Sequence, residues 1–396
     1  MASKSKNWRP QTQAVRGGLT RSEFGETAEA LYLTSGFVYD SAETVEARFL
    51  GEDDGFVYSR FGNPTVAMFE ERMRLLEGTE ACKATATGMA AVNASLFAAL
   101  SAGDHVVAAK ALFGSCRYIL EDLLPRFGVE TTLVEGTDLA AWKAAAKPNT
   151  KLFFLESPTN PALEVIDMQA VADIAHENNA RLCVDNVFAT PVLQRPLEFG
   201  ADIVVYSATK HIDGQGRVLG GAVLGTEEYI MEELLPYIRN TGPSLSPFNA
   251  WVLLKSLETL DLRVNRHADN ALAVANFLGD EAENVVKVLY PGRADHPQHT
   301  LAMQQMKKAG NVIAFEVPHG KDGAFRLLNA LELIDISNNL GDAKSLITHP
   351  ATTTHQKIGP EARAELGISD GMVRLSVGLE DAADVIDDLR HALKAV

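Results

Sequence analysis

The segment DIVVYSATKH, residues 202–211, decides the predicted fold. Its apolar part reads as a strand buried on both faces, and polar residues begin where that strand should end. Open α/β sheets bind their ligands beyond the carboxyl ends of parallel strands, which is where Lys210 and the hydroxyl groups of Ser207 and Thr209 would lie. The alternative is a solvated surface lysine, and the other segments of the chain must decide between the two.

Other short apolar runs along the chain predict the rest of a sheet. They are VVAA (106–109), TTLVE (131–135), KLFFLE (151–156), RLCVDN (181–186) and GAVLG (221–225), and helical segments at 88–103, 118–128 and 168–179 lie between them. Strand, helix, strand order implies right-handed crossovers and a mostly parallel sheet. We therefore predict an α/β fold.

Two further regions flank the part of the chain that carries this sheet, which we expect to span residues 61–255. Residues 1–60 show no sustained helical or strand period, so we expect an arm. A long helical stretch at 249–280 should lead into a smaller α+β domain, residues 256–396. That domain should contain strands at 285–291, 311–317 and 373–380 and an amphipathic helix at its end.

Composition indicates a compact protein that works on small molecules. Of 396 residues, 46% are hydrophobic and 22% charged, and the formal charge of −16 disfavours nucleic acid and anionic membranes as partners. We see no secretory signal and no apolar run long enough to span a bilayer. Cys82, Cys116 and Cys183 have no C-x-x-C spacing, which fits a reducing compartment, so we expect a cytoplasmic protein.

Asp185 and the start of the helix at residue 88 suggest a bound cofactor. Asp185 ends an apolar strand, where a carboxylate needs a partner, and a protonated pyridine nitrogen would keep it ionised. The alternative is a cap on the turn that begins at Asn186. In ATATGMAA the backbone N–H groups of Gly88 and Met89 open a helix, and such helix starts bind phosphate.

Three other segments hold candidate binding groups. Tyr58 and Arg60 in GFVYSRFGNPT (55–65) would point the same way from an extended chain and could contact a phosphate. Asn160 in FLESPTNP (154–161) could hydrogen-bond the oxygen of a pyridoxal ring. Arg374 lies within an apolar strand, where it would pair with a substrate α-carboxylate or form an internal salt bridge.

Taken in order, YSRFGNPT, TATGMAA, ESPTNP, VDN, YSATKH and VRLSVGLE resemble the Cys/Met-metabolism family of pyridoxal-phosphate enzymes over nearly the whole chain. The resemblance implies fold type I, which is aspartate-aminotransferase-like and has a mostly parallel seven-stranded sheet in the large domain, and pyridoxal 5'-phosphate (PLP) as cofactor. Lys210 would attach to the cofactor and Asp185 would pair with its ring nitrogen. The other implied contacts are Asn160 and Phe113 on the ring, and Ser207, Thr209, Gly88 and Met89 on the phosphate.

The resemblance also implies a shared active site. Tyr58 and Arg60 would reach the phosphate of the neighbouring subunit, which the arm contacts, in a homotetramer built from dimers. Arg374 and Asn339 would bind the amino-acid substrate. The roles of His349 and His355, which flank a threonine-rich loop, stay open.

One departure from the family pattern concerns ALFGS, where Phe113 replaces a tyrosine. Stacking on the ring survives but the phenol does not, so proton transfer would fall to Lys210 and Tyr58. In this feature and in segments 211–221 and 337–355, the chain resembles one branch of the family. Enzymes of that branch make L-homocysteine and succinate from O-succinyl-L-homoserine and sulfide in methionine biosynthesis.

Other readings of the same residues stay open. Cystathionine γ-synthases, O-acetylhomoserine sulfhydrylases and the cystathionine and methionine γ-lyases would share nearly every residue named. A non-catalytic module is disfavoured because Lys210, Asp185 and Arg374 all occur. We expect no metal site, because the proline in RADHPQHT (293–300) breaks any helix that could align its histidines.

Overall fold

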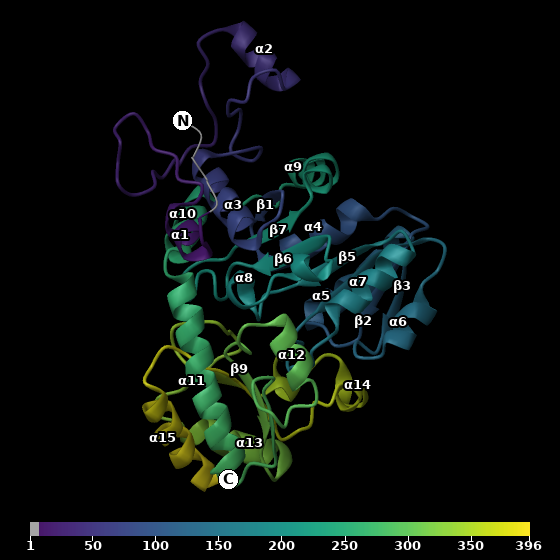
Figure 1. Ribbon diagram of the computed structural model, residues 1–396, viewed down its shortest axis with the longest axis vertical. Helices are drawn as coiled ribbons and strands as arrows, with labels where there is room; N and C mark the ends of the chain where they lie inside the picture. Colours follow the sequence, from purple (N-terminus) through teal and green to yellow (C-terminus); the bar gives the residue numbers. More distant parts are fainter. Residues whose placement is uncertain (1–7) are drawn as a thin grey trace.

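The larger sheet has seven strands in the order β1-β7-β6-β5-β4-β2-β3 in the computed structural model, which describes residues 8–396 (Figure 1). The pairs from β3 through β6 are parallel, and β7 runs antiparallel to both β6 and β1. The prediction of a mostly parallel sheet is therefore confirmed. The strands are β1 (Ala81–Thr85), β2 (His105–Ala109), β3 (Glu130–Val134), β4 (Thr150–Glu156), β5 (Arg181–Asp185), β6 (Ile203–Ser207) and β7 (Gly221–Gly225).

Helices between these strands pack on the sheet and bury its apolar side chains. The helix α4 contacts β6 and β7, and α7 contacts β4 and β5. Phe153 and Phe154 of β4 are fully buried, and so is Trp142 of α6. The helices are α3 (Pro64–Glu77), α4 (Gly88–Ala99), α5 (Gly114–Tyr118), α6 (Leu139–Ala145), α7 (Met168–Glu177), α8 (Thr190–Leu193), α9 (Leu235–Thr241) and α10 (Pro247–Leu257).

Two helix predictions are wrong in detail. The segment 118–128 is not one α-helix, because α5 passes into a π-helical turn and then a 3₁₀ turn that contains Pro125, whose ring removes a backbone N–H. The stretch 249–280 is two helices, α10 and α11 (Leu260–Asp280). The Thr259 hydroxyl donates to the Ser256 carbonyl at this break and competes with helical bonding.

A second sheet has the order β10-β11-β12-β9-β8 and its own apolar core. Its strands are β8 (Lys287–Leu289), β9 (Val312–Glu316), β10 (Asp335–Ile336), β11 (Leu346–Thr348) and β12 (Met372–Ser376). The accompanying helices are α12 (His299–Gln305), α13 (Gly320–Ala330), α14 (Gly359–Glu365) and α15 (Ala382–Ala392). Helix α11 links the two cores, since Val264 packs in the first and Val274 in the second (Figure 1).

The N-terminal region contains two short helices, α1 (Pro10–Arg16) and α2 (Ala42–Leu50). Helix α1 packs on α3, whereas α2 buries none of its residues and stands away from both sheets (Figure 1). The arm proposed for 1–60 begins in residues outside the described part, and the boundaries at 60/61 and 255/256 stay predictions. Within residues 8–396, no helix combines the length and apolarity needed to cross a membrane.

Candidate active site

The carboxyl ends of β4, β5 and β6 open into a cavity of about 280 Å³ between the two sheets. Parallel strands end at the same edge, so side chains from distant segments meet there. Nine predicted site residues line this cavity: Gly88, Met89, Phe113, Asn160, Asp185, Ser207, Thr209, Lys210 and Arg374.

Lys210 lies just past the end of β6 and reaches across to the second sheet's side of the cavity. Its ammonium Nζ donates to the Asn339 side-chain oxygen at 2.5 Å. Burial, helped by the nearby charge of Arg374, lowers the pKa of Lys210 to about 8. Near neutral pH, more of the amine is therefore uncharged and nucleophilic than in a solvated surface lysine.

Two carboxyl groups share the cavity. Asp185 accepts the Val187 amide at 3.1 Å with one oxygen, so the predicted turn cap does form, and the same carboxyl lines the cavity. Glu156 accepts the amides of Phe113 at 3.0 Å and Asn160 at 2.8 Å. Burial raises the pKa of Asp185, and burial together with the charge of Asp185 raises that of Glu156. This pair favours a cationic group bound in the cavity.

Glu156 lines the cavity but is not among the site residues predicted from the sequence. It ends β4 as Asp185 ends the neighbouring β5, and this shared position beside Asp185 is the signal that could have found it. Its two backbone bonds fix Phe113 on one side and Asn160 on the other. Glu156 thereby holds two predicted ring contacts in place.

Arg374 lies on β12 and is 2% exposed. Its guanidinium donates to the Asn160 side-chain oxygen and to the Asn338 carbonyl, each at 2.9 Å. Both acceptors are neutral, so the internal salt bridge considered as the alternative is not what the guanidinium forms. Burial lowers the pKa of Arg374 to about 10. A carboxylate ligand would supply the charge that these neutral partners do not.

The first turn of α4 and the end of β6 form a cradle of hydrogen-bond donors. The Thr87 side chain caps α4 by accepting the Ala90 amide at 3.0 Å. A Cβ at position 88 would lie 2.4 Å from the Cβ of Ser207, so glycine is required for this approach of helix to strand. Backbone N–H groups of the helix start thus lie beside the Ser207 hydroxyl, and Thr209 is held nearby by the Gly220 amide at 3.1 Å. Such a set of donors suits a phosphate.

Tyr58 and Arg60 do not line the cavity of their own chain. The Tyr58 side chain is 43% exposed, and the Arg60 guanidinium lies 4.8 Å from the centre of the Phe61 ring and donates to the Arg239 carbonyl. Asn339 contacts Lys210 without lining the cavity, while its neighbour Asn338 lines it.

Several cavity residues escaped the sequence reasoning. Thr354 comes from the threonine-rich loop, so the composition of that loop was a usable signal. His349 and His355, on the same loop, are buried and do not line the cavity, and burial lowers the pKa of each. The remaining apolar contacts carry no sequence signal of their own: Val92, Cys116, Val187, Phe188, Leu219 and Leu340.

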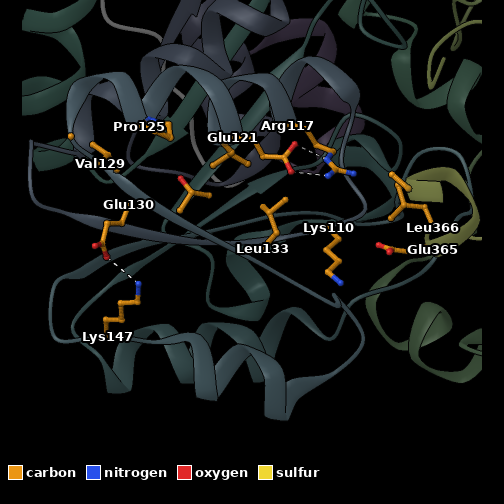
Figure 2. Close-up of a pocket in the computed structure, with 14 residues that line it drawn as sticks. Lys110, Arg117, Glu121, Pro125, Val129, Glu130, Leu133, Lys147, Glu365 and Leu366 are labelled. Carbon is orange, nitrogen blue, oxygen red and sulfur yellow. Dashed lines mark hydrogen bonds and ion pairs between the residues drawn. The ribbon is translucent and has the colours of Figure 1, made fainter. Parts of the chain in front are cut away.

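A larger groove of about 750 Å³ lies elsewhere, between β3 and α14 (Figure 2). Figure 2 shows the ion pairs on its wall, Arg117 with Glu121 and Lys147 with Glu130. None of the predicted site residues lines this groove. These four charges pair with each other rather than converging on the space within the groove.

Comparison with known proteins agrees with this geometry. The chain is 55% identical to an O-succinylhomoserine sulfhydrylase of Mycobacterium tuberculosis (96% of this chain, 95% of the relative). It is 49% identical to the protein of that name in Pseudomonas aeruginosa (97% and 95%). An L-methionine gamma-lyase of Porphyromonas gingivalis is 44% identical, with 97% of each chain covered.

A solved structure from Campylobacter jejuni carries a pyridoxyl-lysine phosphate and superposes with a TM-score of 0.94. It is 30% identical and the match covers 98% of this chain and all of that one (100%). The family model described as Cys/Met metabolism PLP-dependent enzyme matches residues 11–394. The fold, the cavity and these matches agree, and the chain belongs to the Cys/Met metabolism family of PLP-dependent enzymes.

Proposed function

We propose that this protein makes L-homocysteine and succinate from O-succinyl-L-homoserine and sulfide, a γ-replacement that serves methionine biosynthesis. The observation that carries the proposal is the meeting of Lys210, Asp185 and Arg374 in one buried cavity. Relatives at 55% and 49% identity that bear the name O-succinylhomoserine sulfhydrylase support the choice of reaction within the family.

The residues present fit PLP. Lys210 would attach to the aldehyde, Asp185 would hold the proton on the ring nitrogen, Asn160 would contact the ring oxygen, and Phe113 would stack on the ring. The close approach that Gly88 permits leaves donors of α4 and β6 for a phosphate, namely the amides of Gly88 and Met89 and the hydroxyls of Ser207 and Thr209. When bound, the cofactor supplies an electron sink for carbanions at the substrate.

The chain's own side chains supply binding and proton transfer. Arg374 binds the substrate α-carboxylate. Lys210, with its pKa lowered to about 8, takes one proton each from Cα and Cβ and returns them to these carbons after sulfur has added, and its bond to Asn339 orients the amine. The bond between Cγ and oxygen breaks with the electron pair leaving on succinate, and a bond from sulfur to Cγ forms. Because a carboxylate leaves without prior protonation, the phenol that Phe113 lacks is dispensable.

The choice of acceptor is tested by competition. With O-succinyl-L-homoserine and equal concentrations of sulfide and L-cysteine, we expect homocysteine as the dominant product by mass spectrometry. Dominant cystathionine would contradict the proposal, and 2-oxobutyrate as the main product with both acceptors present would identify a lyase instead. O-acetyl-L-homoserine as a parallel donor separates the two acyl groups, and succinyl is expected to be preferred.

The proposed assembly is a homotetramer in the cytoplasm, built from two dimers that each share their active sites. Tyr58 and Arg60 do not reach their own cavity, and residues 8–60 expose large apolar side chains such as Phe24 (87%) and Val38 (95%). A neighbouring subunit would cover these side chains and receive Tyr58 and Arg60 at its phosphate. Three free, buried cysteines suit a reducing compartment.

Sharing of the site is tested by mixing two inactive variants. Arg60→Ala and Lys210→Ala are unfolded together and refolded, so that about half of the dimers are mixed and each of these has one intact site. We expect about a quarter of the wild-type activity to return. If Arg60 served its own chain, no site in any dimer would be intact and the mixture would stay inactive.

A further inference from the structure

A buried polar cluster joins the segment that carries Lys210 to the second sheet. We call it the joint, and it consists of His211, His267, Asn311 and Ser376. His211 follows Lys210 directly, His267 lies on α11, and Asn311 and Ser376 belong to the second sheet's region. Each of the four is at most 3% exposed, so their polar atoms need hydrogen-bond partners within the protein.

Asn311 lies at the centre of the joint, and its surroundings allow one orientation of its amide. The nitrogen Nδ2 lies 2.8 Å from the Val377 carbonyl, which can only accept, so this atom is the NH₂ group. It also donates to the Ser376 hydroxyl at 3.1 Å. The amide oxygen therefore faces His211 Nε2 at 2.7 Å and accepts a proton from it.

The histidine protons follow from the same reasoning. His211 must carry its proton on Nε2 in order to donate to Asn311. His267 Nδ1 lies 2.7 Å from the Val377 carbonyl and so carries a proton there. Burial lowers the pKa of His211 to about 3 and that of His267 to about 4, so each ring carries this one proton and is neutral near neutral pH. The joint is a neutral, directional network rather than an ionic one.

From Ser376 the joint reaches the two groups that would contact the substrate. The Ser376 hydroxyl accepts the Gly341 amide at 2.9 Å, and a Cβ at position 341 would lie 2.8 Å from the backbone nitrogen of His211. The loop 338–341 is thus held against the residue that follows Lys210. Asn339 of this loop contacts Lys210, and the Asn338 carbonyl accepts from Arg374.

Arg374 is fixed by the same strand. It precedes Ser376 by two residues on β12, so both side chains lie on one face of that strand. Ser376 bonds to Asn311, and Asn311 bonds to His211, so a chain of direct hydrogen bonds runs from the strand of Arg374 to the segment of Lys210. Lys210 follows a strand of the larger sheet, whereas Arg374 lies on a strand of the second sheet, and the joint connects the two.

We infer that His211 and Asn311 are positioning residues that set the placement of Arg374 and Asn339 relative to the Lys210 amine. They act on where the α-carboxylate, and therefore Cα, lies with respect to the group that takes its proton. The inference deepens the proposed function, because it concerns the amino-acid end of the same site. It does not depend on which acyl group leaves.

The test measures binding of L-norleucine, which has the α-amino and α-carboxylate groups but no leaving group. The variants are Asn311→Asp, whose second oxygen would oppose the Val377 carbonyl, and His211→Ala, which removes the donor. For both variants loaded with PLP, we expect the Kd for L-norleucine, read from the cofactor absorbance, to rise about tenfold or more. The Kd of the apo protein for PLP should change by less than about twofold. The second readout shows that the cofactor end of the site is intact.

Rescue and a matched control separate positioning from general destabilisation. His211→Gln keeps an N–H donor toward Asn311 and should return the Kd to within about threefold of wild type. His105→Ala removes another fully buried histidine, which bonds to Thr150 and Thr132 in the large sheet, and should lower the thermal midpoint without changing the Kd. If His211→Ala does not fold, Asn311→Gly takes its place with the same expectation.

Three results would overturn the inference. The first is a wild-type Kd for L-norleucine in both Asn311→Asp and His211→Ala, or the replacement of the latter. The second is a parallel loss of affinity for PLP and L-norleucine in these variants. The third is an equal rise in the Kd for L-norleucine in His105→Ala. Because L-norleucine carries no succinyl group, each result can be read even if the competition between sulfide and cysteine rejects the proposed reaction. The positioning role of His211 and Asn311 and the proposed reaction can therefore fail independently of each other.

Discussion

Alanine at position 210 is expected to lower homocysteine formation by at least about a thousandfold, because one amine would both hold the cofactor and transfer the substrate protons. The side chain is the amine that lines the cavity beside Asn339, and its pKa is lowered to about 8 by burial. No other lysine lines that cavity and could replace it among residues 8–396. Steady-state rates with saturating PLP measure the effect.

The matched control for this variant is Lys110→Ala. Lys110 lines the larger groove of Figure 2, away from the cavity of Lys210. We expect wild-type turnover and wild-type cofactor content for this control. Retention of a tenth or more of the activity by Lys210→Ala would remove Lys210 from the chemistry.

The second large effect is expected for Asp185→Asn. An amide at this position is similar in shape and can still accept the Val187 amide, but it carries no charge to hold the proton on the ring nitrogen. Turnover should fall about a hundredfold or more, and the affinity of the apo protein for PLP should fall with it. Stopped-flow absorbance for the rate and equilibrium titration for the Kd measure the two quantities.

Asp202→Asn is the control for the loss of a carboxylate near the same strand. Asp202 lies at the amino end of β6, where it accepts the Leu182 amide, and so belongs to the opposite edge of the sheet. Its replacement should leave both turnover and cofactor affinity unchanged. Equal losses in the two variants would show that Asp185 acts through the stability of the sheet alone.

The sheet could be predicted largely because parallel strands buried on both faces are almost continuously apolar. The run KLFFLE and its neighbours have this composition, and each became a strand. The strand β1, ACKAT, was not predicted because Lys83 interrupts its apolar run; in the fold the charge of Lys83 is neutralised by Glu70 at 2.9 Å. The break between α10 and α11 escaped because it depends on side-chain hydroxyls rather than on a proline or a glycine.

The candidate site could be located from one rule, that ligands bind where parallel strands end. This rule brought Lys210 and Asp185 together from segments that are adjacent only in the sheet. The rule does not apply to the second sheet, so no pattern in the sequence could predict the contact between Asn339 and Lys210. The joint was equally hidden, since His211 and Asn311 are 100 residues apart and share no pattern.

The role of Lys210 as the point of covalent attachment is the central claim, and reductive trapping tests it most directly. The protein loaded with PLP is reduced with borohydride, digested and sequenced by mass spectrometry. We predict one phosphopyridoxyl group per chain, on the peptide that contains Lys210. A group on any other lysine, or a cofactor that is still lost on dialysis after reduction, would contradict this account of the site.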